Sequence, residues 1–146
     1  MFRTLLMATL SVLLVVSSTG CGNPTDPDLI PVSALLPASR EIVLEYGEDL
    51  RLEGSVLRLS FGEVLEDSRC PLDVTCVWQG NGKVVIGLAA GTGPTHSLIL
   101  NTSLEPLSVV QSGIRVTLLE LTPAPDSGSS ILPEDYAVRL RLEPLS

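Results

Sequence analysis

The feature that most constrains the fold is a regular alternation of apolar and polar residues, which begins near Arg40. Its cleanest run lies at residues 136–142. Because successive side chains of a strand point to opposite faces, this alternation is typical of strands with one buried face. Shorter runs with the same spacing occur at residues 42–46, 50–53, 57–61, 84–88, 98–100 and 114–118. No window after residue 40 shows a convincing ten-residue helical stripe.

Turn-forming residues separate these runs and set the fold class that we expect. They gather at positions 47–48, 62, 80–82, 91–94, 111–113 and 123–133. Seven or eight short strands joined by such turns predict an all-β fold, a single antiparallel β-sandwich of immunoglobulin-like type, with a small β-barrel as the alternative. Leu119 and Leu121 fall out of phase after Leu118, which indicates a β-bulge or a strand whose second half is covered on both faces. Because aromatic residues make up only 3% of the chain, the core must consist of Leu, Val and Ile.

The first twenty residues have the composition of a secretory signal. Arg3 supplies a positive charge, residues 5–16 are almost wholly apolar, and residues 17–20 are small. The apolar run is short for a membrane span, which needs about 20 residues, so a short transmembrane anchor is the weaker alternative.

The end of this segment carries a resemblance. Ser18-Thr19-Gly20-Cys21 resembles the lipobox of bacterial lipoproteins, although Ser18 stands where Leu is usual. The resemblance implies a signal peptide at residues 1–20 and a diacylated Cys21 that becomes the mature N-terminus and holds the protein at a membrane. Ordinary cleavage nearby, with Cys21 as a free thiol, is the alternative. Gly22 stands where an Asp would resemble an inner-membrane retention signal, so we expect a cell-envelope protein on the outer membrane.

Two further segments follow the predicted signal peptide. Residues 21–38 contain four prolines and few charges, which is typical of a semi-rigid tether. Residues 29–36 are too apolar for a wholly solvated linker, so part of them is expected to add an edge strand or to pack on the domain. Residues 39–146 then form the β-sandwich domain.

The charge of the chain limits its partners. The full sequence carries −8, and removing residues 1–20, whose only charge is that of Arg3, leaves −9. Nucleic-acid binding depends on basic side chains against phosphates, so a nucleic acid is a poor candidate partner. We expect contact with a membrane through the lipid anchor, and with an unknown envelope protein or ligand.

The segment DSRCPLDVTCVWQGNG, residues 67–82, holds the strongest candidate motif. Zinc sites use about four ligands, and here Cys70 and Cys76 stand alone with His96 far along the chain. Redox dithiols are typically spaced C-x-x-C. We therefore expect a structural disulfide between Cys70 and Cys76, since exported proteins are oxidised, and we expect no metal and no cofactor. Asp67 and Ser68 are expected to cap backbone N–H groups, and Arg69 to pair with a carboxylate; a recognition surface is the alternative.

Trp78 has two interpretations, as a core residue or as an exposed binding anchor. A Trp packed near a disulfide resembles the arrangement in immunoglobulin-type sandwiches. We predict a hairpin closed by a three-residue loop, Gly80 to Gly82, with Gly82 in the left-handed conformation. That register sets Trp78 opposite Val84, on the more strongly apolar face, and both interpretations of Trp78, buried or exposed, stay open.

The same segment resembles a group of bacterial secreted proteins and lipoproteins with the core motif D-S-R-C-P-x-x-V-x-C-x-W-x-G. The matching residues are Asp67, Ser68, Arg69, Cys70, Pro71, Val74, Cys76, Trp78 and Gly80. The resemblance implies a domain type and an envelope location, and it implies no activity.

The sequence nominates no catalytic set. It lacks a nucleophile elbow, a phosphate-binding loop and a calcium-binding acid ladder, and His96 alternates with Leu98 as a strand residue would. We expect a non-enzymatic binding or structural module. One alternative is an envelope inhibitor that presents loops such as 91–95 or 123–133, and a weaker one is a hydrolase or lectin-like site.

Overall fold

A computed structural model describes residues 35–145 of the chain. The predicted signal peptide, Cys21 and most of the predicted tether lie outside the described residues. Eight strands make up the described part: β1 Arg40–Glu45, β2 Asp49–Arg51, β3 Leu57–Asp67, β4 Gly82–Ala90, β5 His96–Asn101, β6 Ser108–Gln111, β7 Ile114–Thr122 and β8 Ala137–Pro144. A single turn of 3-10 helix, η1 (Pro133–Asp135), precedes β8.

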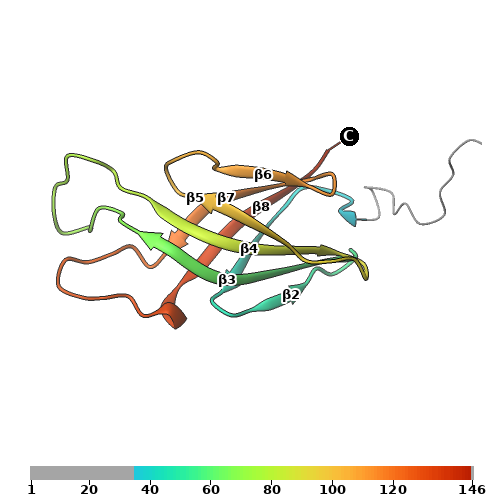
Figure 1. Ribbon diagram of the computed structural model, residues 1–146, viewed down its shortest axis with the longest axis horizontal. Helices are drawn as coiled ribbons and strands as arrows, with labels where there is room; N and C mark the ends of the chain where they lie inside the picture. Colours follow the sequence, from blue (N-terminus) through green and yellow to red (C-terminus); the bar gives the residue numbers. More distant parts are fainter. Residues whose placement is uncertain (1–34, 146) are drawn as a thin grey trace, which may run out of the picture.

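The strands form two four-stranded sheets, in the orders β1-β8-β7-β6 and β2-β3-β4-β5. Every pairing is antiparallel. The sheets lie one against the other and do not close into a barrel (Figure 1). The predicted all-β sandwich is therefore confirmed, and the barrel alternative is not.

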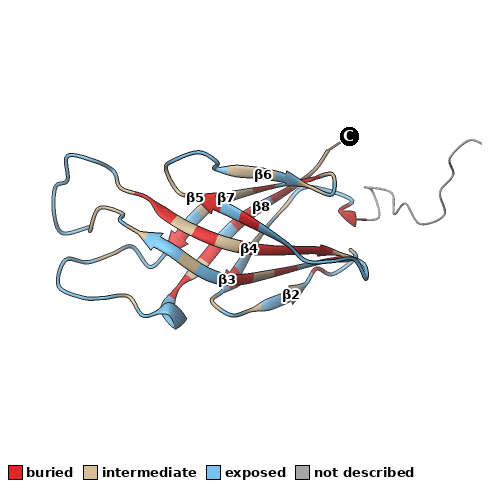
Figure 2. Cartoon of the chain, in the orientation of Figure 1, coloured by how far each residue is buried: buried red, intermediate tan, exposed pale blue. Residues whose placement is uncertain are grey.

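The core lies between the sheets and is aliphatic, as predicted. Figure 2 shows buried residues alternating with exposed ones along most strands. Phe61, Ile86 and Leu140 have no exposed area, and the ring of Tyr46 meets Phe61 edge-on with centroids 5.6 Å apart. The predicted alternation thus assigns the buried face of these strands correctly.

The end of the apolar segment before the domain also packs on the core. Leu35 and Leu36 are buried, and the Ser55 hydroxyl donates a hydrogen bond to the Leu35 carbonyl. This bears out the expectation that part of residues 29–36 packs on the domain. Within residues 35–145, no helix has the length and apolar character to span a bilayer.

Irregular pairing occurs where the alternation breaks. The register of β7 against β8 shifts between Leu118 and Glu120, which confirms the predicted bulge. Strand β3 carries two further shifts, one after Phe61 and one after Val64, and runs on to Asp67, well beyond the predicted end. Strand β6 was not predicted.

Two long loops meet at one end of the sandwich. They are residues 68–81 between β3 and β4 and residues 123–136 between β7 and β8, which together we call the tip (Figure 1). Leu35 and the turn between β2 and β3 lie at the opposite end (Figure 1).

Candidate functional site

The first tip loop begins as a continuation of the β3–β4 ladder. Asp67 pairs with Gly82 in the sheet, and the Ser68 amide then donates to the Asn81 carbonyl at 2.8 Å. One rung further, the Cys70 amide donates to the Gln79 carbonyl at 3.1 Å. The register is unchanged across all three pairs, so the loop has a rigid stem.

This pairing corrects the predicted hairpin. Cys76 and Trp78 lie in the loop, not on a strand, and Val84 faces Val64 of β3. The left-handed residue of the stem is Gly80, with φ 72°, and not Gly82. Strand β3, and not residues 76–79, pairs with β4. The reason is that Phe61 and its neighbours in β3 bury several large side chains beside β4, whereas residues 76–79 would place only one large apolar side chain, Trp78, on the core face.

Both stem glycines are required by close packing. A Cβ on Gly80 would overlap the Ser68 carbonyl oxygen in a conformation that already disfavours side chains. A Cβ on Gly82 would lie 2.7 Å from the Leu121 side chain. Both glycines therefore have a structural role that differs from the predicted turn.

The predicted disulfide is present. Cys70 and Cys76 are joined with their Cα atoms 5.9 Å apart, and the bond closes the far end of the loop into a small ring. Pro71 lies inside this ring, and its carbonyl accepts from the Val74 amide at 3.4 Å. For a ring of this size, the chain-entropy model gives a stabilisation of about 2 kcal/mol.

A largely covered ion pair lies next to the stem of this loop. Residues two apart on an extended chain point to the same side, so Asp67 and Arg69 face inward together. The Arg69 guanidinium donates to both oxygens of Asp67, from Nε at 2.7 Å and from Nη2 at 2.6 Å. Only 10% of the Asp67 side chain and 13% of the Arg69 side chain are exposed. The Asp67 carboxylate also accepts from the Arg69 amide at 3.3 Å, so the predicted pairing and capping both involve this residue.

The ion pair joins the two sheets at the tip. Arg69 Nη1 donates to the Leu121 carbonyl of β7, and Nη2 donates to the Pro123 carbonyl at 2.7 Å. The hydroxyl of Tyr136, the last residue before β8, donates to Asp67 at 2.9 Å. These polar contacts connect the end of β3 to the other sheet.

The pKa values of this cluster follow from its contacts. Burial alone would raise the pKa of Asp67, but the hydrogen bonds from Arg69 and Tyr136 outweigh it and hold the pKa below its ordinary range. Burial raises the pKa of Tyr136, and its hydrogen bond to Asp67 raises it further. The pair is therefore ionised and the phenol neutral at neutral pH, which fits a structural element.

A second polar layer supports the stem from the side. The buried side-chain amide of Asn81 donates to the side-chain oxygen of Asn101 at 2.9 Å, and the Ser103 hydroxyl donates to the Gly80 carbonyl. The Ser68 hydroxyl accepts from the backbone N–H of Asn81 at 3.2 Å, which confirms the predicted bond between Ser68 and a backbone N–H group. The Asn81–Asn101 pair was not predicted, because its two residues lie on different segments of the chain with no local pattern between them.

The second tip loop holds the ring in place. The Leu72 amide donates to the Pro125 carbonyl at 3.0 Å, and the Ser127 amide donates to Asp73 at 2.9 Å. The Ser127 hydroxyl also donates to Asp73, and these bonds lower the pKa of that carboxyl. The two loops form one connected surface.

The first tip loop exposes its apolar side chains. Trp78 is 82% exposed, Val77 91% and Leu72 80%. The predicted register, with Trp78 opposite Val84 on the apolar face, is therefore wrong, and of the two interpretations of Trp78 the exposed one holds. Trp78 leaves the stem one residue beyond Gln79, after the last rung of the ladder, so no neighbouring strand covers it.

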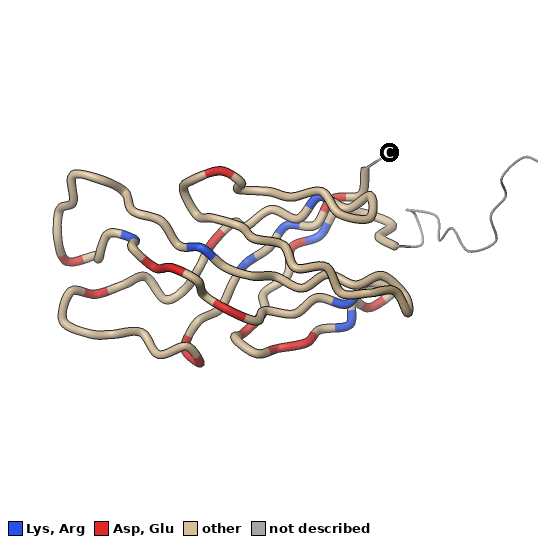
Figure 3. Tube along the Cα trace, viewed as in Figure 1, with Lys and Arg blue, Asp and Glu red and all other residues tan. Residues whose placement is uncertain are grey.

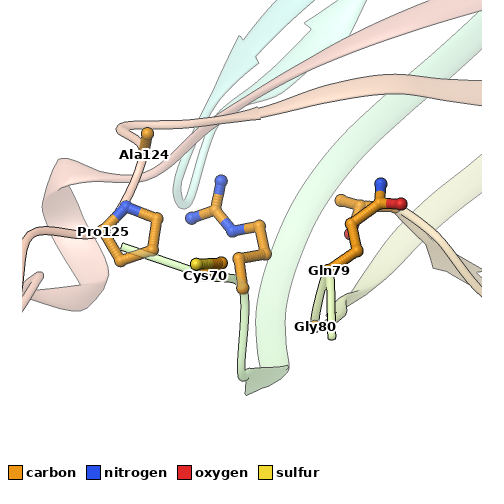
Figure 4. Close-up of a pocket in the computed structure, with 7 residues that line it drawn as sticks. Cys70, Gln79, Gly80, Ala124 and Pro125 are labelled. Carbon is orange, nitrogen blue, oxygen red and sulfur yellow. The ribbon is translucent and has the colours of Figure 1, made fainter. Parts of the chain in front are cut away.

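Two hollows flank the stem at Gln79 and Gly80. One, of about 320 Å³, is lined by Trp78 and Leu104 together with Glu66, Ser68, Asn81 and Ser103, and we call it the tip groove. The other, of about 280 Å³, separates the stem from the second loop (Figure 4). In Figure 4, Ala124 and Pro125 lie on one side of it and Gln79 and Gly80 on the other.

The sequence singled out one histidine, and the structure places it away from the tip. His96 is exposed at the start of β5, opposite Leu88 and far from the tip in the sheet. Across residues 35–145 no three metal-binding side chains of the His, Cys, Asp or Glu type come together.

Acidic residues predominate at the tip (Figure 3). Residues 66–83 and 123–136 hold six carboxylates and two basic side chains, a net charge of −4. Both basic side chains already face carboxylates: Arg69 pairs with Asp67, and Lys83 lies 3.5 Å from Glu66.

Comparison of the chain with protein-family models, curated proteins and solved structures found no match. The fold and the tip together define the class: a β-sandwich that presents a disulfide-closed loop with an exposed aromatic side chain.

Proposed function

We propose that this protein is a lipid-anchored, non-enzymatic binding module of the bacterial cell envelope. The observation that carries the proposal is the exposed Trp78 on a loop braced by a disulfide, a ladder stem and a largely covered ion pair. Exposed aromatic side chains on rigid supports are typical anchors of protein–protein interfaces.

The geometry of the chain supports a tethered binder. The lipobox resemblance of Ser18 to Cys21 places the anchor before the domain. The domain begins near Leu35, at the end of the sandwich opposite the tip (Figure 1). A chain held at that end directs Trp78 away from the membrane and toward a partner.

The binding half of the proposal is tested by photo-crosslinking in the native host. A photoreactive residue replaces Val77 at the tip or, as the matched control, the exposed Val43 on β1. We expect a defined adduct from position 77 that Trp78→Ala abolishes, and none from position 43. No adduct from position 77, or the same adduct from both positions, overturns binding through the tip.

The anchor is tested separately by the intact mass of the chain made in a lipoprotein-processing host. We expect a protein that begins at Cys21 with acyl chains attached. An unmodified Cys21, or a different first residue, overturns the lipid anchor and leaves the tip proposal standing.

A further inference from the structure

We infer that the tip groove receives a basic side chain, above all arginine, from a partner protein. This inference rests on the proposed binding function and names the chemistry of its partner. It is carried by the composition of the groove, which places an exposed indole and a carboxylate around one hollow.

The walls of the groove suit the stem of a long side chain. Trp78 and Leu104 are both exposed and both line the hollow of about 320 Å³. Asn81, at the buried side, is already engaged with Asn101 and Ser103. The groove therefore offers apolar contact at Trp78 and Leu104, and the exposed Gln79 also lines it.

Glu66 supplies the charge at the groove. Glu66 and Ser68 are two residues apart on an extended chain and share the face opposite Asp67, and the Ser68 hydroxyl donates to Glu66 at 2.9 Å. The other Glu66 oxygen lies 3.5 Å from Lys83 in a pair whose side chains are 46% and 37% exposed. A surface pair of this kind contributes little free energy, so an incoming cation can share the carboxylate.

An indole beside a carboxylate favours a cation. Trp is the strongest aromatic partner for cations, and the attraction grows when water is excluded. Arginine satisfies both groups at once, because its planar guanidinium stacks on a ring while its N–H groups reach a carboxylate.

The charge of the tip as a whole favours the same partner. Asp73, Asp126, Glu134 and Asp135 belong to the tip, and none of them forms an ion pair within the described residues. Such a surface attracts a basic partner and repels an acidic one. A neutral glycan could stack on Trp78 but would gain nothing from these carboxylates.

The test uses the full chain, purified in maltoside micelles, and four defined probes. Three are short glycine-spaced peptides that differ only in carrying two Arg, two Lys or two Glu residues, and the fourth is chitotetraose. Since Trp78 is the only tryptophan, its emission reports on the groove directly. Anisotropy of labelled peptides measures binding to the variants.

We expect the Arg peptide to bind at least tenfold more tightly than the Glu peptide and to shift Trp78 emission, and we expect its affinity to fall as salt rises. Trp78→Ala and Glu66→Gln should each lower the affinity for the Arg peptide at least threefold. Glu53→Gln, which removes one carboxylate near Ser55 at the far end of the sandwich, should change this affinity less than twofold.

Three outcomes overturn the inference. They are equal binding of the Arg and Glu peptides, equal losses in Glu66→Gln and Glu53→Gln, and Trp78-dependent binding of chitotetraose without that of the Arg peptide. If one of these outcomes occurs while position 77 still gives a crosslink, the proposed binding function stands and only the inference of a basic partner is overturned.

Discussion

The interior of the sandwich and the tip distribute their side chains in opposite ways. The interior buries Phe61, Leu140 and other apolar residues completely and leaves charges outside. The tip largely covers Asp67 and Arg69 and exposes Trp78. The two regions therefore rely on different forces, hydrophobic burial in one and hydrogen bonds, an ion pair and a disulfide in the other.

This difference bears on function, because an exposed indole does not contribute the free energy that its burial would add to folding. Burying a Trp removes roughly 150–250 Å² of surface from water, which at about 25 cal/mol per Å² contributes about 4–6 kcal/mol. The tip holds Trp78 in solvent on a stem fixed by other means. An arrangement of this kind is expected where the exposed side chain has a use other than folding.

The comparison predicts its largest effect in the interior. Phe61→Ala removes the ring that packs on Tyr46 and leaves a cavity, so the free energy of unfolding should fall by about 3–5 kcal/mol. Denaturant unfolding followed by far-UV circular dichroism measures it. The exposed Val43→Ala serves as the control, with an expected change under about 0.5 kcal/mol. A loss below about 1 kcal/mol in Phe61→Ala would show that the interior is not the main source of stability.

The next largest effect is expected from the ion pair of the tip. Arg69→Ala leaves Asp67 largely covered without its cation and removes the hydrogen bonds to the carbonyls of Leu121 and Pro123. The free energy of unfolding should therefore fall by about 2–4 kcal/mol. The matched control is Arg58→Ala, whose pair with Asp49 is about half exposed and should contribute less than about 1 kcal/mol. Equal losses of unfolding free energy in the two variants would contradict the conclusion that polar contacts stabilise the tip.

Acid should weaken the tip by a smaller amount. The folded state holds the pKa of Asp67 below its unfolded value, so the stabilisation is complete above that unfolded value, near pH 4, and is lost as pH falls through the folded pKa. The difference in unfolding free energy between wild type and Asp67→Asn should be constant above about pH 5 and shrink below pH 4. The loss is smaller than in Arg69→Ala because a protonated Asp67 keeps its side chain in place. A difference that grows in acid would reverse the sign assigned to this pKa shift.

The strand pattern and part of the tip could be predicted from the sequence because their signals are local. Alternation identified the buried faces of most strands, and the phase break after Leu118 identified the bulge. Cys70 and Cys76, and Asp67 with Arg69, are close in sequence, so their pairing needed no knowledge of the fold.

The rest depends on contacts between distant segments. The two register shifts in β3 interrupt its alternation after Phe61, which hid the strand that occupies the edge of β4. Without that strand in view, the sequence pattern favours a pairing of Trp78 with Val84, the place that Val64 takes in the structure. Strand β6 has two adjacent valines and too few residues for a period, and the Tyr136 bond to Asp67 spans half the chain.

The smallest effect on stability should come from the residue with the largest proposed effect on binding. Trp78→Ala removes a side chain that is 82% exposed, so the free energy of unfolding should change by less than about 0.5 kcal/mol. In wild type, the single Trp should emit near the wavelength of indole in water, be readily quenched by acrylamide, and shift little on unfolding. Tyr136→Phe is the matched tip control, because it deletes only a hydroxyl but removes a bond to Asp67, and it should cost more than the whole indole. If Trp78→Ala proved the more destabilising of the two, the indole would be part of the fold, and the contrast between an apolar interior and a polar tip would no longer hold.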